Sequence, residues 1–176
     1  ALIKEYNEGY KGILYGGFMA TRNGVKLIEY NARFGDPEAM NLLTLIDTDF
    51  ASVCMSIANG NLVDVKFKSQ ASVCKYVVPK GYGSNPAKDA TLIVDDSYKE
   101  HSDLYYAAVN VNDIGDITTT SSRAAAIVST GDDIETAESR CEAGLLHISG
   151  NNIFVRHDIA KPHLIEKRIQ NMESIR

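Results

Sequence analysis

The first third of the chain changes from strand-type to helix-type spacing of its apolar residues. Residues 12–20 and 25–31 read as two strands, and the Asn-Gly pair at 23–24 between them is the strongest short signal for a β-hairpin. After Pro37 the apolar positions recur at i, i+3, i+4 and i+7, which predicts two consecutive helices. These positions are Ala39, Leu42, Leu43 and Ile46 in the first helix, and Phe50, Val53, Cys54 and Ile57 in the second.

Polar and turn residues mark where the second helix begins and ends. Asp47, Thr48 and Asp49 precede it and can cap its amino end, and Gly60 fits a left-handed C-cap. Between about 60 and 70, Asn, Asp and Lys interrupt the apolar periodicity. We therefore expect a domain boundary here, with residues 1–62 in one domain and 63–176 in the other.

The remainder of the chain is dominated by short strands. Strands are predicted at 71–79, 91–94, 104–111, 116–120, 123–129 and 153–156. A helix is predicted over 133–148, capped by Asp132 or Asp133, and a final helix begins at Pro162. The apolar face of the 133–148 helix comprises Ile134, Ala137, Cys141, Leu145 and Ile148. Strands with helices segregated from them predict an α+β fold.

Composition narrows the class of protein. With 44% apolar residues the chain can form a core, and a net charge of −5 argues against a nucleic-acid-binding surface. No apolar run is long enough to span a bilayer, so no membrane partner is expected. The three cysteines, Cys54, Cys74 and Cys141, lie in apolar stretches without a Cys-x-x-Cys pair. Buried, reduced thiols in a cytoplasmic protein are predicted, rather than structural zinc.

The candidate chemistry lies in the ten residues from Glu29 to Glu38. Residues two apart on a strand share a face, so Glu29 and Asn31 should project together, roughly 7 Å apart along the strand. A carboxylate beside an amide oxygen suits Mg²⁺, which takes few protein ligands and leaves positions for phosphate oxygens. Asp36 is expected to cap a helix that starts at Pro37, and such a helix start favours anions.

A purely structural interpretation of this stretch is a capped helix after a strand, with solvated charges. Against it, Glu29 and Asn31 are expected to share a face with Val25 and Leu27, where a structural strand should continue apolar. The whole string therefore favours a functional site.

The string Asn31–Asn41, "NARFGDPEAMN", closely resembles the signature of the phosphoribosylamine–glycine ligases, or glycinamide ribonucleotide synthetases, of the ATP-grasp superfamily. The resemblance continues at residues 10–21 and, more loosely, at 71–82, 121–137 and 154–159. It implies that residues 1–62 are the end of an ATP-grasp domain, formed by an antiparallel hairpin plus helices. Residues 63–176 would be the small β-rich C-terminal domain of such a synthetase.

The resemblance also implies a reaction and its residues. Glycine would be joined to 5-phosphoribosylamine through a glycyl phosphate, with ATP cleaved to ADP and phosphate. Glu29 and Asn31 would hold the Mg²⁺ or Mn²⁺ that bridges the ATP phosphates. Arg33 would bind a carboxylate or phosphate, and Asp36 would either hold the ammonium of glycine or serve only as an N-cap.

Such ligases also need an ATP lid, an adenine pocket and an amino-terminal domain. These do not fit into the few residues before the first strand, so the rest of the same chain is an expected partner and this part alone is expected to be inactive. Glycine, 5-phosphoribosylamine and ATP are the expected small-molecule partners.

Gly16 and Gly17 favour a bulge in the first strand, and Ala160 stands where the family usually has glycine.

A different ATP-grasp carboxylate–amine ligase is one alternative function. A non-catalytic interaction module with a degenerate grasp site is the other.

Overall fold

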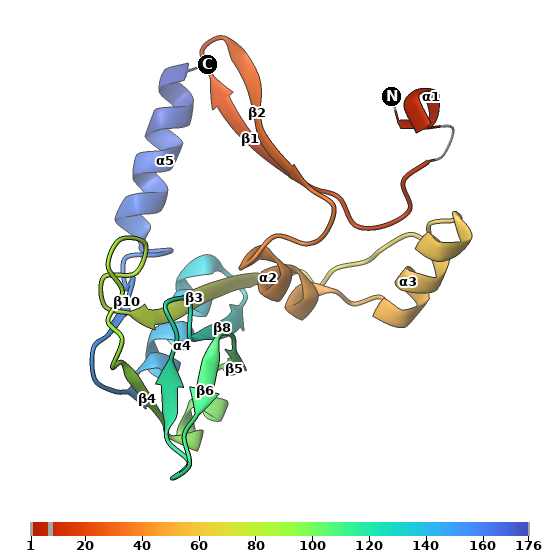
Figure 1. Ribbon diagram of the computed structural model, residues 1–176. Coiled ribbons are helices and arrows are strands. Elements are labelled where there is room, and N and C mark those ends of the chain that lie inside the picture. The colour runs from red at the N-terminus through yellow and green to blue at the C-terminus, as the bar shows by residue number, and fades with distance from the viewer. Residues whose placement is uncertain (1, 7–8, 176) are drawn as a thin grey trace. The chain divides into compact units, whose positions relative to one another are not determined.

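The computed structural model describes residues 2–6 and 9–175 and divides the chain into two compact units (Figure 1). The hairpin unit comprises residues 1–68 with 170–176, and the sheet unit comprises residues 69–169. No helix among the described residues is long and apolar enough to cross a membrane. The mixture of helices with antiparallel sheets confirms the predicted α+β class.

The hairpin unit contains the predicted hairpin and the two predicted helices. Its elements are α1 (Leu2–Tyr6), β1 (Tyr15–Thr21), β2 (Gly24–Asn31), α2 (Glu38–Leu45) and α3 (Phe50–Asn59). Asp49 caps α3 by accepting a 2.8 Å hydrogen bond from the Ser52 amide, and Gly60 ends it with φ at 70°. The cap and the left-handed C-cap confirm the local sequence signals. Cys54 is exposed, so the prediction of three buried thiols is wrong there.

The sheet unit contains two four-stranded sheets, with strand orders β10-β3-β8-β5 and β6-β7-β4-β9. The first sheet comprises β3 (Ala71–Pro79), β5 (Asp103–Tyr106), β8 (Ala125–Gly131) and β10 (Ile153–Val155). The second comprises β4 (Thr91–Val94), β6 (Val109–Val111), β7 (Ile117–Thr119) and β9 (Ile148–Ser149). The helical elements of this unit are the 3-10 helix η1 (Asp96–Glu100), α4 (Ile134–Leu145) and the first part of α5 (Pro162–Ile175), whose residues from Gln170 onward are grouped with the hairpin unit.

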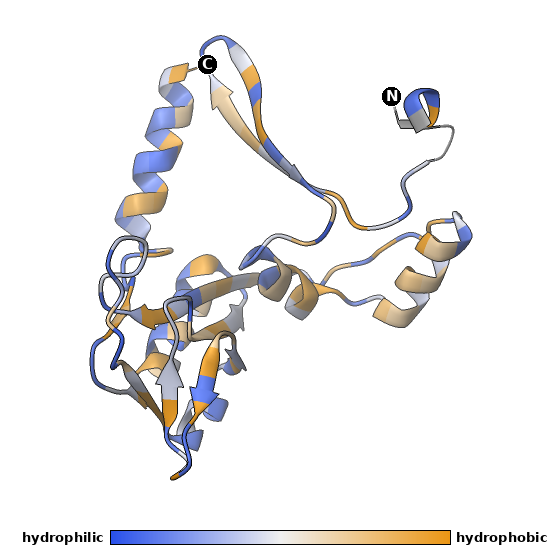
Figure 2. Cartoon of the chain, in the orientation of Figure 1, coloured by the Kyte–Doolittle hydropathy of each residue, from blue (hydrophilic) through white to orange (hydrophobic). Residues whose placement is uncertain are grey.

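The core of the sheet unit forms where α4 covers the central strands. Ala137, Cys141 and Leu145 from α4 are buried against side chains of β3 and β8, among them Val77 and Ile127. Three of the five predicted face positions of this helix are therefore correct. Ile134 is exposed, and Ile148 lies in β9, because α4 ends at Leu145. The helix α5 carries both polar and apolar residues along its length, and none of them is buried (Figure 2).

One predicted strand is two strands in different sheets. The predicted strand 104–111 is interrupted at Ala107 and Ala108, whose amides donate to the carbonyls of Ala124 and Arg123. The chain leaves the first sheet as β5 and enters the second as β6. Because the break is fixed by hydrogen bonds to a distant segment, the local apolar pattern does not reveal it.

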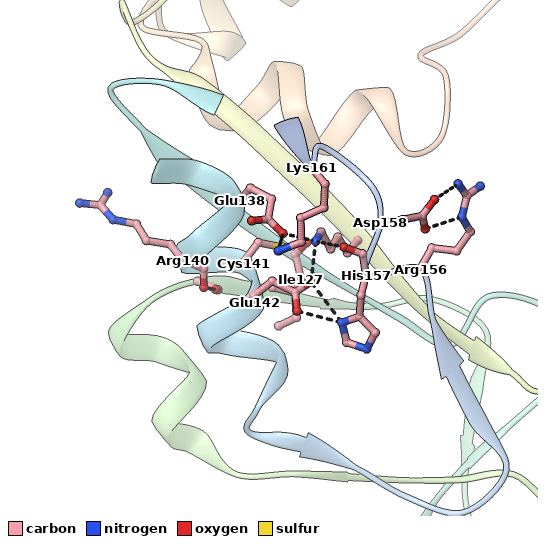
Figure 3. Close-up of polar contacts among 11 residues, drawn as sticks. Ile127, Glu138, Arg140, Cys141, Glu142, Arg156, His157, Asp158 and Lys161 are labelled. Carbon is pink, nitrogen blue, oxygen red and sulfur yellow. Dashed lines mark hydrogen bonds and ion pairs between the residues drawn. The ribbon is translucent and has the colours of Figure 1, made fainter. Parts of the chain in front are cut away.

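A buried lysine joins three segments of the sheet unit, next to the contacts of Glu138, Glu142, His157 and Lys161 that Figure 3 shows. Lys75, on β3, is fully buried, and its Nζ donates to Glu138 Oε1 at 2.6 Å, to Glu142 and to the His157 carbonyl at 3.1 Å. Lys161 Nζ lies 2.8 Å from Glu138 Oε1, and His157 Nδ1 lies 2.8 Å from Glu142 Oε2. A buried ammonium is tolerated only with partners of this kind. The network therefore fixes residues 157–161 against β3 and α4.

This network predicts an acid-sensitive contribution to stability. Burial opposes ionisation of Glu138 and Glu142, but hydrogen bonds and charges from Lys161, Lys75 and His157 outweigh it, so the pKa of each carboxyl is lowered from its usual 4.5. Their contribution is therefore present above the unfolded-state pKa and is lost as the pH falls below it. Urea unfolding should give a falling free energy of unfolding below about pH 4.5.

A double variant, Glu138→Gln with Glu142→Gln, isolates this contribution from the carboxylates of helix caps such as Asp49 and Asp133, whose pKa values are also lowered. Its free energy of unfolding should fall less steeply with acid than that of the unchanged chain. Equal slopes would show that the network does not carry the effect.

Ala160 occupies a backbone conformation that favours glycine. Its φ is 65°, in the turn where the Lys161 amide donates to the Asp158 carbonyl. An L-residue in the left-handed region costs roughly 1–2 kcal/mol, which a glycine avoids. Part of this gain is lost again, because a glycine gives the unfolded chain more conformational entropy. Ala160→Gly should therefore raise the free energy of unfolding by about 0.5 kcal/mol in urea titrations. Ala107→Gly, at an exposed position without positive φ, should lower it. A decrease for Ala160→Gly would contradict the argument.

Candidate metal site on the hairpin

The bulge in the hairpin sets which side chains of β2 share a face. Gly17 pairs with Glu29 and Phe18 pairs with Leu27, which leaves Ile28 as the extra residue. A Cβ on Gly17 would lie 3.4 Å from Glu29 Cγ and 3.8 Å from Ile28 Cβ, so both side chains lie on one face of the hairpin. The hairpin has a bulge next to Gly17, but the extra residue lies in the second strand, so the prediction of a bulge in the first strand is wrong. The expectation that Glu29 and Asn31 share a face with Val25 and Leu27 is wrong, because the extra residue resets the alternation.

Glu29 and Asn31 lie together beyond the bulge, as the strand period predicts. Asn31 Nδ2 donates to Glu29 Oε1 at 3.1 Å, with Glu29 exposed and Asn31 partly buried. This contact orients the amide so that its oxygen remains available as an acceptor. The pair offers one carboxylate and one amide oxygen at the end of the strand, a donor set that suits Mg²⁺.

Tyr15 and Glu38 extend this face of the hairpin unit. Tyr15 pairs with Asn31 across the hairpin, and its hydroxyl donates to Glu38 Oε1 at 3.0 Å. This hydrogen bond, the charge of Glu38 and the charge of Glu29 raise the pKa of Tyr15, so the phenol remains a proton donor. Gly35 leaves the space for this contact, because a Cβ there would meet the Glu38 carboxylate and approach Tyr15 Cε1 to 3.2 Å.

The sequence did not single out Tyr15. Counting back from the Asn23–Gly24 turn in an unbroken hairpin places Tyr15 opposite Tyr30. Only the extra residue at Ile28 moves it opposite Asn31. Gly16 and Gly17 indicate a bulge in the hairpin, but they do not show which residue is the extra one. Tyr15 could have been placed opposite Asn31 only if Ile28 had been identified as that residue.

Arg33 lies in the turn after β2 and does not join the Glu29–Asn31 pair. Its Nη1 donates to the Phe34 carbonyl at 2.8 Å, and it forms no ion pair within the described part of the chain. The Phe34 ring packs at a 40° tilt on Phe50, with centroids 6.1 Å apart. The turn that carries Arg33 is therefore attached to α3 through an aromatic contact.

The prediction that Asp36 caps α2 is wrong. The N-cap position is Pro37, and no side chain caps this helix. The Ala39 amide donates to the Gly35 carbonyl and the Met40 amide to the Pro37 carbonyl, each at 2.9 Å. Backbone carbonyls already accept from these two amides, so neither amide is free to bind an anion at this helix start.

The donor set and charge of this face suit a cation with few protein ligands. No group of three His, Cys, Asp or Glu side chains in residues 2–6 and 9–175 could hold a metal ion. Glu29 and Asn31 offer two oxygen atoms beside each other, and the Glu38 carboxylate accepts a hydrogen bond from Tyr15 in the same unit. An ion held this way keeps positions for water or phosphate oxygens, which is the behaviour expected of Mg²⁺.

Comparison with known proteins identifies related sequences along the whole chain. The family described as phosphoribosylglycinamide synthetase, C domain, matches residues 72–162, and the family described as phosphoribosylglycinamide synthetase, ATP-grasp (A) domain, matches residues 1–39. A phosphoribosylamine–glycine ligase of Methanocella arvoryzae is 51% identical over 178 residues, covering 100% of this chain. That of Methanocaldococcus jannaschii is 50% identical and covers 99%.

The chain spans about 40% of the length of these curated relatives. Among solved structures, the phosphoribosylamine–glycine ligase of Thermotoga maritima matches with a TM-score of 0.69 at 22% identity. The match covers 82% of this chain and 36% of that structure. It supports the fold of the described chain.

Proposed function

The chain belongs to the phosphoribosylglycinamide synthetase family, and from this premise we propose that it is the metal-binding part of an ATP-dependent carbon–nitrogen ligase. The ligase would join glycine to 5-phosphoribosylamine, giving glycinamide ribonucleotide, ADP and phosphate, in purine biosynthesis. Residues 1–62 would complete an ATP-grasp domain, and residues 63–176 would form the C-terminal domain. The observation that carries this proposal is the Asn31–Glu29 contact at the end of β2, which Ala32 separates from the Arg-Phe-Gly-Asp-Pro-Glu turn.

The proposed chemistry has two displacement steps. An oxygen of the glycine carboxylate attacks the γ-phosphorus of ATP, and ADP leaves with the electron pair of the broken phosphorus–oxygen bond. The amine of phosphoribosylamine then attacks the carbonyl carbon of glycyl phosphate, and phosphate leaves. In such phosphoryl transfers the protein mainly positions reactants and neutralises charge.

The residues of the hairpin unit would contribute to the first step. Glu29 and Asn31 would hold Mg²⁺ or Mn²⁺, which when bound reduces the repulsion between the phosphates and the incoming carboxylate. Arg33 uses one N–H on the Phe34 carbonyl, and we assign its other donors to a carboxylate or phosphate. We assign the Asp36 carboxylate, in the turn before α2, to the ammonium of glycine.

Nucleotide protection tests the proposal against a non-catalytic module. In a chimera, the remaining part of the Methanocella arvoryzae ligase would be joined to this chain, and its thermal unfolding would be followed with ATP, with and without Mg²⁺. A ligand at a hundredfold its dissociation constant adds roughly 2.7 kcal/mol of stability. We expect a rise in unfolding temperature that requires Mg²⁺. The absence of any Mg²⁺-dependent rise would favour the interaction module.

A further inference from the structure

A series of contacts joins the first residue of α2 to the Glu29–Asn31 pair. Asn31 Nδ2 donates to Glu29 Oε1 at 3.1 Å, and Asn31 is paired with Tyr15 across the hairpin. The Tyr15 hydroxyl in turn donates to Glu38 Oε1 at 3.0 Å. Residues directly opposite each other in an antiparallel pair have their side chains on the same face. Tyr15 therefore lies on the face of the hairpin that carries Glu29 and Asn31, and its hydroxyl links this face to Glu38.

Two carboxylates act on the Tyr15 hydroxyl. The hydrogen bond to Glu38, the charge of Glu38, partial burial and the charge of Glu29 together raise the pKa of the phenol. Charges that are exposed to water act only over short distances, because solvent and salt screen them. The two carboxylates therefore lie in one part of the hairpin unit, on either side of the same phenol.

The position of the Glu38 carboxylate is defined by its neighbours. Its Oε1 accepts from Tyr15, and a Cβ on Gly35 would collide with its Oε2. Gly35 is buried, and its carbonyl accepts from the Ala39 amide at 2.9 Å. Because Gly35 has no side chain, the carboxylate lies against the backbone of the turn before α2.

The helix dipole alone does not account for this arrangement. It favours a carboxylate such as Glu38 in the first turn of α2, but it does not require that a phenol from another strand bind that carboxylate. Tyr15 holds the side chain in one direction, which a solvated first-turn charge does not need.

We propose that Tyr15 is a positioning residue of the cation site at Glu29 and Asn31, and that Glu38 is the group it positions. Held by the phenol, the Glu38 carboxylate accepts hydrogen bonds from water molecules bound to the cation. Mg²⁺ usually keeps several water ligands, and groups that hold a metal's ligands from outside contribute to affinity. The inference rests on the proposed function, and it adds two residues to the proposed Glu29–Asn31 site.

Titration of the 176-residue chain with Mn²⁺, followed by NMR, tests this assignment without catalytic turnover. Mn²⁺ broadens the signals of nearby amides, and excess Mg²⁺ should reverse the broadening. We expect broadening at Glu29, Asn31 and Glu38 over the same range of Mn²⁺ concentration. Tyr15→Phe should raise the dissociation constant of Mn²⁺ about tenfold, as is typical when a group that supports a metal's ligands is removed.

Tyr30→Phe is the matched control, since it removes the same hydroxyl from the opposite face of the same hairpin. A Cβ on Gly16 would lie 3.1 Å from Tyr30 Cε1. A Cβ on Gly17, which points to the other face, would lie 3.4 Å from Glu29 Cγ. The dissociation constant of Mn²⁺ for Tyr30→Phe should therefore equal that of the unchanged chain.

A double variant separates positioning from a general loss of hairpin structure. Glu38→Ala should weaken Mn²⁺ binding by itself, and adding Tyr15→Phe to it should cause little further loss, because the group that the phenol holds is already absent. Additive losses would show that Tyr15 does not act through Glu38, and would overturn the proposal.

The outcomes distinguish this inference from the proposed cation site itself. If Glu29→Gln abolishes binding but Tyr15→Phe binds Mn²⁺ as tightly as the unchanged chain, the positioning role is wrong and the Glu29–Asn31 site stands. Broadening that spares Glu38 would have the same meaning. The absence of saturable Mn²⁺ binding by the unchanged chain would overturn both.

Discussion

Glu29→Gln should lower ATP-dependent turnover of the ligase chimera by about 10²-fold or more while leaving the fold intact. Replacing the carboxylate removes one of two proposed metal ligands, and a metal supplies several kcal/mol of charge stabilisation in the transition state. Each 1.36 kcal/mol corresponds to about a tenfold change in rate. The fold should survive because Glu29 is exposed and its contact is with Asn31, two residues away. The measurement is ADP release at saturating ATP, with circular dichroism to verify folding.

Glu135→Gln provides the matched control for this variant. Glu135 is an exposed carboxylate in the first turn of α4 and lies outside the proposed metal site, so its substitution should leave turnover unchanged. A Glu29→Gln chimera with full turnover would show that the metal assignment is wrong. Raising the Mg²⁺ concentration should restore part of the lost rate if the loss is one of metal affinity.

Lys75→Met should destabilise the chain by about 3 kcal/mol, measured as the free energy of unfolding in urea. Removing one partner of a buried ion pair costs about 3–5 kcal/mol, because the remaining charge is left in the protein interior. Here Glu138 and Glu142 both lose the ammonium, and the His157 carbonyl loses a donor. We expect the lower end of the range because Lys161 still pairs with Glu138.

Two further variants separate this mechanism from a loss of packing. Lys99→Met removes an exposed pair with Asp96, at 60% and 81% side-chain exposure, and should leave the free energy of unfolding nearly unchanged. Adding Glu138→Gln and Glu142→Gln to Lys75→Met should recover part of the lost stability, since no uncompensated carboxylate remains. A loss of less than about 1 kcal/mol for Lys75→Met would contradict the importance of the network.

Features set by local sequence were predictable. The hairpin turn at Asn23–Gly24, the cap at Asp49 and the C-cap at Gly60 depend on a few neighbouring residues, and the structure has each of them. The pairing of Glu29 with Asn31 followed from the two-residue period of a strand. These inferences needed no knowledge of distant contacts.

Features set by distant contacts were not predictable from the pattern. Tyr15 reaches Asn31 only because the bulge shifts the register, and Asp36 loses its capping role to the carbonyls of Gly35 and Pro37. Lys75 stands in the middle of an apolar strand, and its carboxylate partners lie 63 and 67 residues further along the chain. From the sequence alone these partners cannot be identified, so a charged residue at this position contradicts the apolar pattern of a buried strand and its role cannot be predicted.

The most direct test of the proposed ligase is ADP release by the chimera with ATP and Mg²⁺, adding glycine and 5-phosphoribosylamine separately and together. The account predicts ADP release that requires both substrates together. Release with a different acid–amine pair would keep the ATP-grasp chemistry and contradict the assigned substrates. No release with any pair, from a chimera that folds, would contradict the assignment of this chain to a working ligase.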